Sequence, residues 1–186
     1  SLVGSEMCIR DRENADIEQK KALLDQLKAF VLTGNQEEDV KVLEDFQEKW
    51  NSLGKLPERL RVIDTRFNKI MSAIYKKLNF DKKQIELIKY NNKLEHMPND
   101  DNALAKEEIF VRKKIDDIRK DILQLENNLQ FFTNVDKKHP LMREALKSIH
   151  EQHEALALWE DKLKELRLRE KKEEEEVLAP EAPKSV

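Results

Sequence analysis

Turn-forming residues are scarce in this chain of 186 residues, which contains only 3 Gly and 5 Pro. A β-sandwich, a β-barrel or a doubly wound sheet needs a turn roughly every 8 to 12 residues. So few chain breakers cannot easily supply those turns, and we therefore predict an all-α fold. The longest unbroken apolar run is Ala155–Trp159, far shorter than the ~20 residues that cross a bilayer. We expect no membrane-spanning segment.

The first twelve residues, SLVGSEMCIRDR, share neither the periodicity nor the composition of the rest. They resemble the translated read-through of a sequencing adapter, so we treat residues 1–12 as an artefact and leave them out of the fold. A genuine disordered leader is the alternative. The single cysteine, Cys8, lies in this segment, so the sequence predicts neither a disulfide nor a cysteine metal site. We expect the natural chain to continue upstream.

Apolar residues recur at helical spacing in residues 13–79 and predict a bundle of three short amphipathic helices. We expect the first helix to end at Gly34, in the left-handed conformation, and the second at Gly54. The third helix is predicted from about residue 58 to 78, after Pro57. The expected buried stripes are Ile17, Leu24, Leu27, Phe30 and Val31; Val40, Leu43, Phe46 and Trp50; and Leu60, Ile63, Phe67, Ile70, Ile74 and Leu78.

Residues 80–98 are expected to form a linking helix capped by Asp81, and Pro98–Asn102 a turn. Residues 99–170 then carry two heptad seams separated by a break at residues 133–140, which predicts an antiparallel coiled-coil hairpin. The charged and proline-containing residues 171–186 are expected to form a disordered acidic tail. The seams are Val111, Ile115, Ile118, Ile122, Leu125, Leu129 and Phe132, and Met142, Ala145, Ile149, Gln152, Leu156, Trp159, Leu163 and Leu166.

One set of spaced residues resembles the repeat of the family called domain of unknown function 349. That repeat combines an apolar stripe, a Trp, a Gly-x-x-Pro turn and a following helix that bears an aromatic residue. Here the matching residues are Leu43, Phe46, Trp50, Gly54, Pro57, Phe67 and Ile74. The resemblance covers about residues 17–78 and implies a three-helix repeat in a bacterial, cytoplasmic protein without an established activity.

The rest of the chain looks like the C-terminal end of multi-repeat members of that family found in Bacteroidota. The chain would then be the last repeat and tail of a longer protein. One departure from the family pattern lies at Asp64-Thr65-Arg66, where many repeats carry a Trp or Tyr. We expect this departure to thin the core of the bundle. The motif itself is interpreted as structural, because Phe46 and Trp50 lie one helical turn apart and bury large aromatic surfaces.

No residue pattern in the sequence predicts catalysis or a cofactor. A phosphate-binding loop needs two glycines and a lysine within eight residues, whereas Gly34 and Gly54 are twenty apart. His150 and His153 could share a metal with Glu154, but no further ligand cluster accompanies them, so we expect solvated histidines and no metal site. Neither a catalytic triad nor any other activated nucleophile is recognisable.

Charge is the feature with functional content. Residues 55–93 contain eleven basic and four acidic residues, although the whole chain has a net charge of −3. Arg59, Arg66, Lys69 and Lys76 share a stripe on the third helix that could contact RNA phosphates or an acidic partner. We favour the alternative that this stripe offsets the acidic second helix, because no aromatic residues interleave with it as a stacking platform for bases.

These observations favour a non-enzymatic interaction or scaffold protein, in which a repeat bundle positions a coiled-coil arm for a protein partner. The alternative is an RNA- or ribosome-associated module that uses the basic stripe. Self-association through the seam residues is a third option. The sequence does not identify the partner or the process.

Overall fold

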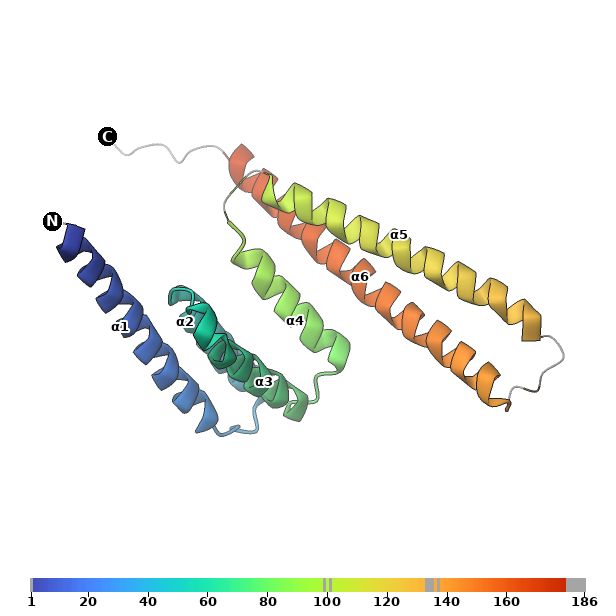
Figure 1. Cartoon of the computed structure of the whole chain (residues 1–186), viewed down its shortest axis with the longest axis horizontal. Helices are drawn as coiled ribbons and strands as arrows, with labels where there is room; N and C mark the ends of the chain where they lie inside the picture. The colour runs from blue at the N-terminus through green and yellow to red at the C-terminus, as the bar shows by residue number, and fades with distance from the viewer. Residues whose placement is uncertain (1, 99, 101, 133–135, 137, 180–186) are drawn as a thin grey trace. The chain divides into compact units, whose positions relative to one another are not determined.

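The computed structural model describes residues 2–98, 100, 102–132, 136 and 138–179, with the backbone alone for residues 2–8. Its regular elements are all helices, and no strand occurs in the described ranges (Figure 1). This confirms the predicted all-α fold. The chain divides into two compact units, Ser1–Ile85 and Glu86–Val186. None of the helices described is both long and apolar enough to cross a bilayer.

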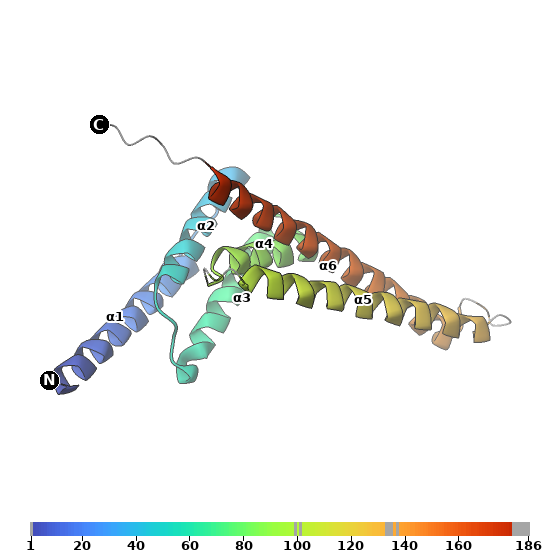
Figure 2. The ribbon, with the colours of Figure 1, turned by 90° about the horizontal axis from the view of Figure 1, so that it is seen from above.

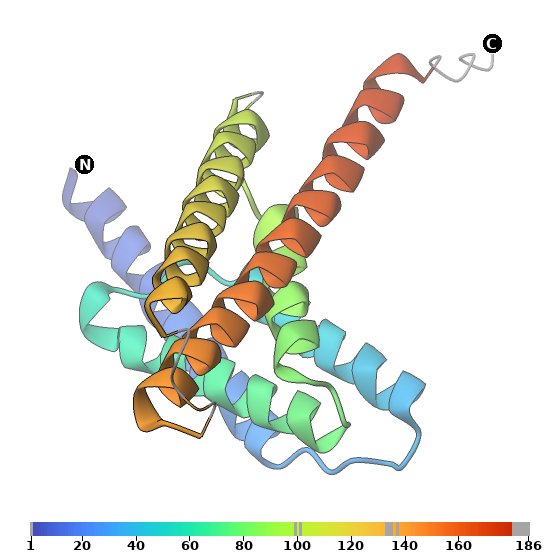
Figure 3. The same cartoon turned by 90° about the vertical axis from the view of Figure 1, so that its right-hand side faces the viewer.

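The first unit contains α1 (Leu2–Lys28), α2 (Gln36–Ser52), a short 3-10 helix η1 (Glu58–Leu60) and α3 (Arg61–Lys77). A loop joins α1 to α2, as Figure 3 shows, and α1 packs against both α2 and α3. The helices form here because apolar residues recur at steps of three and four, so that each helix has one face to bury. The most deeply buried members of this core are Leu24, Leu27, Leu43, Trp50 and Phe67.

The ends of α1 differ from those predicted. The helix continues back to Leu2, through the segment that the sequence analysis set aside, but residues 9–15 are all exposed and burial begins at Ile17. At the other end α1 stops at Lys28, and Gly34 lies in the connection to α2 with a φ of 91°. Val31 is therefore outside the helix and 79% exposed, so its expected place in the buried stripe is wrong.

The residues around Gly34 serve the start of α2 instead of the end of α1. The side chain of Asn35 accepts hydrogen bonds from the backbone N–H groups of Glu37 and Glu38, at 3.1 and 3.4 Å. Asp39 is completely buried, and its Oδ1 accepts from the backbone N and the Oγ1 of Thr33 at 3.1 and 2.9 Å. The Asn35 bonds satisfy donors that the start of α2 leaves open, and the Asp39 bonds hold Thr33 of the preceding loop against the helix.

The second unit is built on a helical hairpin of α5 (Ala103–Leu129) and α6 (Pro140–Leu178), with a 3-10 turn η2 (Gln130–Phe132) after α5. The two long helices lie side by side and run in opposite directions (Figures 1 and 2). Arg119 pairs with Glu160, and Glu126 with His153. Each helix advances seven residues between these pairs, in opposite directions, so the register is antiparallel as predicted. Part of the expected break, residues 133–135 and 137, lies outside the described residues.

The helix predicted as a linker, α4 (Lys82–Glu95), begins in the first unit, and its residues from Glu86 onward belong to the second unit and contribute to its core. Asp81 caps it as expected: its Oδ1 accepts from the Gln84 N–H at 2.7 Å, while Gln84 Oε1 accepts from the Asp81 N–H at 2.9 Å. Tyr90 and Leu94 pack in one cluster with residues of both hairpin helices, namely Val111, Ile115 and Leu166. The second unit is therefore a hairpin with a third helix packed near its base. Residues 99 and 101 of the expected Pro98–Asn102 turn are not described.

The C-terminal helix is longer than predicted. Residues 171–178 were expected to begin the disordered tail, but α6 continues through them to Leu178. All eight are exposed, so packing does not hold them in the helix. Lysine and glutamate have high helix propensity, and adding residues to an existing helix costs much less than starting one. Residues 180–186 of the expected tail lie outside the described part of the chain.

Candidate functional site

The family motif builds the core of the first unit. Leu43 and Phe67 are completely buried, and the rings of Trp50 and Phe67 stack with centroids 4.0 Å apart and an interplanar angle of 7°. Phe46 is half-buried and meets Phe30 edge-on at 6.1 Å. Ile74, about two turns further along α3 than Phe67, is also buried. The side chains of the motif therefore pack α2 against α3.

The turn residues of the motif position α3. Pro57 precedes η1, which leads directly into α3. A Cβ atom at Gly54 would lie 2.9 Å from Oδ2 of Asp16 on α1, closer than packed atoms approach. Glycine at position 54 therefore leaves room for the Asp16 carboxylate, the flexible end of a side chain that a larger residue would displace. The second helix, α2, ends at Ser52, two residues before the Gly54 stop that the sequence suggested.

Asp64 has a role that the sequence analysis missed. Its Oδ1 accepts a hydrogen bond from Trp50 Nε1 at 3.0 Å and pairs with Lys20 Nζ at 3.6 Å. Lys20 is only 4% exposed, and its ammonium group lies 4.9 Å from the centre of the Trp50 ring. The departure from the family's aromatic residue thus supplies a carboxylate that holds a buried lysine against the motif tryptophan. A lysine within an apolar stripe, three residues after Ile17, was the available signal.

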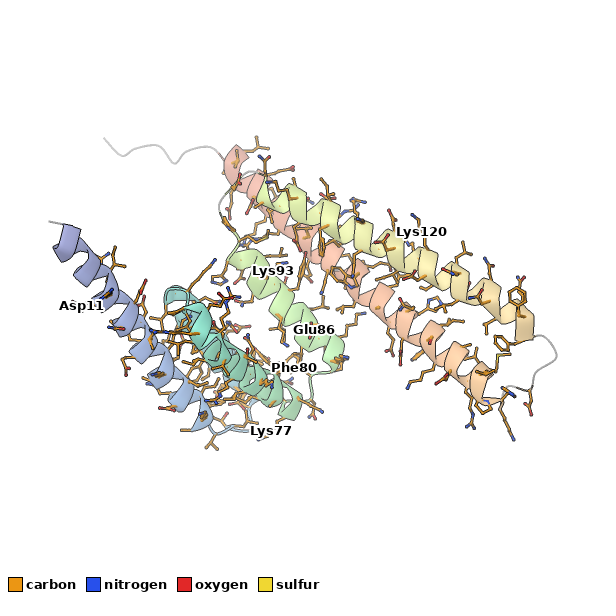
Figure 4. The ribbon with its side chains drawn as sticks, in the orientation of Figure 1. Asp11, Lys77, Phe80, Glu86, Lys93 and Lys120 are labelled. Atoms are coloured by element: carbon orange, nitrogen blue, oxygen red, sulfur yellow. The ribbon has the colours of Figure 1, made fainter. Side chains whose placement is uncertain are left out.

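The predicted basic stripe lies on the solvent-facing side of η1 and α3. Arg59, Arg66, Lys69 and Lys76 are all exposed, and none of their side chains forms an ion pair or hydrogen bond with another residue that the structure describes. From residue 66 to 76 the stripe is about 15 Å long at 1.5 Å per residue. Lys77 follows at the end of α3, as Figure 4 shows. The four cations could contact an anionic surface together.

The sequence left two explanations for the basic stripe, charge compensation of the acidic helix α2 and contact with RNA, and the structure bears on both. On α2, the exposed Asp45 pairs with Lys49 of its own helix at 2.9 Å, and no ion pair joins α2 to the stripe among the described side chains. Direct pairing therefore does not explain the stripe. Conversely, the aromatic residues of the first unit are buried or half-buried, so the stripe has no stacking platform for bases in the described residues.

The two histidines do not converge on one point. His150 Nε2 lies 2.9 Å from Glu154 on its own helix, whereas His153 Nε2 lies 3.5 Å from Glu126 on α5. All four side chains are at least half exposed. No group of three potential metal ligands occurs in the described part of the chain.

The hairpin is buried unequally along its length. At the end near α4, the α5 seam residues Val111, Ile115, Ile118 and Ile122 are buried, as is Leu166 of α6. The α6 seam residues Leu156, Trp159 and Leu163 are half-buried at this end. Aromatic and cationic groups cover this end: Lys162 Nζ lies 4.1 Å from the centre of the Trp159 ring, and desolvation lowers the pKa of that lysine. Lys93, labelled in Figure 4, pairs with Glu107 at 3.3 Å.

Beyond the reach of α4 the same seam is only half-buried. This distal half of the hairpin comprises residues 123–132 and 140–152. Its predicted seam positions are all intermediate in exposure, and other large apolar side chains around them are exposed. Phe131 is 85% exposed, Leu123 59% and Leu141 56%. The residues of intermediate exposure are Leu125, Leu129, Phe132, Met142, Ala145, Ile149 and Gln152.

Of the comparisons with known proteins, only the one with protein-family models finds a match. No curated protein and no solved structure matches the chain. One family model, described as Domain of Unknown Function (DUF349), matches residues 9–59. The match includes Leu43, Phe46, Trp50, Gly54 and Pro57 and ends before α3, so it does not reach Phe67 or Ile74. Residues 9–59 therefore match the model of the family that the motif resembles.

Proposed function

We propose that this chain is a non-catalytic interaction module, in which the distal half of the hairpin binds an amphipathic helix of a protein partner. The setting we propose is the bacterial cytoplasm, as the family resemblance implies. The observation that carries the proposal is the unequal burial of one continuous seam. On α5 the seam is buried from Val111 to Ile122 and half-buried from Leu125 onward. On α6 only Leu166, in the cluster that includes α4, is buried, and the other seam residues are half-buried.

Two paired helices leave part of their apolar faces exposed to solvent. A third amphipathic helix that packs on the pair covers this remaining apolar surface. The core around Tyr90 and Leu94 is an example within the same unit. At the distal end Phe131 and Leu141 add exposed apolar surface at the hairpin tip. Such contiguous apolar surface is typical of protein interaction sites.

Site-specific photo-cross-linking in cells tests this proposal. A photoreactive amino acid at position 131, near the tip, is compared with one at position 109, where Ile109 is 70% exposed near the other end of α5. We expect a discrete adduct with a second protein from position 131 and none from position 109. The adduct should disappear when Leu141 and Leu146 are both changed to Ser.

Other outcomes contradict the proposed partner. An adduct of twice the chain's mass, confirmed by light scattering of the purified protein, would mean that the surface serves self-association. Equal labelling from positions 131 and 109 would mean that the hairpin tip is not a specific site. Adducts that survive the Leu141→Ser and Leu146→Ser changes would have the same consequence.

RNA binding is the second candidate, supported by the unpaired, exposed cations of the basic stripe. Binding of structured RNA should weaken steeply as salt increases and should be lost when Arg59, Arg66, Lys69 and Lys76 are changed to Glu. A matched control reverses four exposed lysines of the second unit: Lys106, Lys113, Lys120 and Lys171. Lys120 is labelled in Figure 4 on α5. Absence of binding at low salt, or equal loss in the control, excludes this function.

A further inference from the structure

A cavity of about 330 Å³ opens in the first unit, where α1, α2 and the start of α3 meet. Its size is at the lower end of the range typical of small-ligand sites. The lining includes three cationic side chains, Lys20, Lys55 and Arg61, and one carboxylate, Asp64, with Trp50 between them. The residues come from three different elements, so only the folded unit brings them together.

Two of the three cationic side chains in this cavity have no partner among the described residues. Asp64 is engaged with both Lys20 and Trp50, whereas the side chains of Lys55 and Arg61 form no ion pair or hydrogen bond with any described residue. Asp16 is not among the lining residues, but it lies against Gly54, the residue before Lys55, and is counted here as a second negative charge. The cations still outnumber the carboxylates, three to two. An anion would therefore meet two cations that have no other partner and one buried ammonium group.

The tryptophan restricts which ligands fit. One face of the Trp50 ring is stacked on Phe67 and the Lys20 ammonium group lies over the ring at 4.9 Å, so no planar group can stack on it. Recognition must come from the anionic part of the ligand. A phosphomonoester carries a charge of about −1.5 to −2 at neutral pH, which matches two unpaired cations better than a single carboxylate does. Guanidinium and ammonium groups are the usual phosphate ligands in proteins.

We propose that this cavity binds the phosphate group of a small phosphomonoester. Lys55 and Arg61 are its direct ligands, and the buried Lys20 adds positive charge to the cavity wall. This site is independent of the hairpin proposed above, because all its residues belong to the first unit. It also differs from the basic stripe, since Arg59, Arg66, Lys69 and Lys76 do not line the cavity.

The full chain with Trp159→Phe provides the assay, because Trp50 is then the only tryptophan. Adenosine monophosphate, inorganic phosphate and adenosine are titrated at constant ionic strength, followed by Trp50 fluorescence and, on the unsubstituted chain, by calorimetry. We expect saturable binding of adenosine monophosphate and none of adenosine. Binding of inorganic phosphate as well would identify the phosphate alone as the ligand.

Matched variants separate the cavity from general surface charge. Arg61→Gln and Lys55→Gln should each weaken binding about tenfold or more, since each removes a charged hydrogen bond to the ligand. Arg66→Gln and Lys69→Gln, which change exposed cations outside the cavity, should leave the affinity unchanged. The proposal is overturned if neither phosphate compound binds saturably, if adenosine binds equally well, or if the two pairs of variants weaken binding alike.

Discussion

Two carboxylates in the first unit show how a single residue can depart from its expected role. Asp39 is a favourable charge in the first turn of α2, yet it is completely buried and bonded to Thr33. Asp64 lies in the segment where the sequence departs from the pattern that it resembles, yet it bonds to Trp50 and Lys20. A buried or partly buried carboxylate is costly unless hydrogen bonds compensate it, and both have such bonds, although Oδ2 of Asp39 is buried without a partner among the described residues.

Removing the Asp64 carboxylate should destabilise the first unit. In Asp64→Ala, Trp50 Nε1 loses its acceptor and the buried Lys20 loses its counter-charge. We expect a loss of about 2 to 3 kcal/mol in the free energy of unfolding, from urea denaturation followed by Trp50 fluorescence. Asp45→Ala is the control, because Asp45 pairs with Lys49 in solvent and should cost under about 0.5 kcal/mol. Equal effects would exclude the buried role of Asp64.

The two tyrosines should both resist ionisation. Burial, and then the charge of Glu44, raise the pKa of Tyr75 to about 12. Burial also raises the pKa of Tyr90, as does Glu107, whose Oε1 accepts a hydrogen bond from the Tyr90 hydroxyl at 3.0 Å. In the unfolded chain both ionise near 10. Between about pH 10 and 12 the folded chain retains protons that the unfolded chain has lost, so stability falls as pH rises.

Tyrosinate absorbance measures this directly, because the chain has only 2 Tyr. The native protein should show no ionisation step near pH 10, and the same protein in concentrated urea should show both. Changing Tyr90 to Phe should remove one of the two steps in urea and reduce the loss of stability at alkaline pH. A native step near pH 10 would contradict the burial of one or both hydroxyls.

At the scale of elements, local hydrogen bonds explain where several helices start. The packing of α4 against the hairpin depends instead on residues distant in the sequence. Asn35, Asp81 and His139 each accept a backbone N–H at the start of a helix. Such bonds join residues two or three apart, so a sequence motif can predict them. The burial of Tyr90 and Leu94 against α5 and α6 depends on contacts with residues far along the chain, and no local pattern indicates it.

Gln152 tests the seam of the hairpin. It is half-buried on α6, between Ile149 and Leu156, and a polar group in an apolar seam lowers stability. We expect Gln152→Leu to stabilise the hairpin by about 1 kcal/mol, raising its melting temperature by about 4 °C or more in a circular dichroism melt. Gln124→Leu, at an exposed position of α5, should give no comparable increase. A lower melting temperature for Gln152→Leu would show that position 152 is not in the seam.

At the scale of the whole molecule, the chain has two separate cores, each with one tryptophan and one tyrosine. Trp50 and Tyr75 belong to the first unit, and Trp159 and Tyr90 to the second. The contacts of Trp50 and Trp159 with other rings lie within their own units. Each tryptophan therefore reports on one unit.

Core truncations should act on one unit at a time. Phe67 and Leu166 are both completely buried, one in each unit. We expect Phe67→Ala to cost about 3 to 5 kcal/mol and to accelerate amide hydrogen exchange in α1 to α3. Leu166→Ala should cost about 2 to 5 kcal/mol and accelerate exchange in α5 and α6. If either substitution accelerated exchange equally in all five helices, the two cores would form one cooperative unit.

The amino-acid sequence by itself determined that the chain is helical and which residues face inward on each helix. Scarce turn formers and apolar spacing act over a few residues, so Leu43, Phe67 and the seam from Val111 to Ile122 could be predicted without a structure. Only the tertiary structure decided that Lys20 is buried, that Asp64 bonds to Trp50, and that α4 completes one end of the hairpin. These features join residues 14 to more than 70 positions apart, and such contacts depend on how the helices pack rather than on any local pattern.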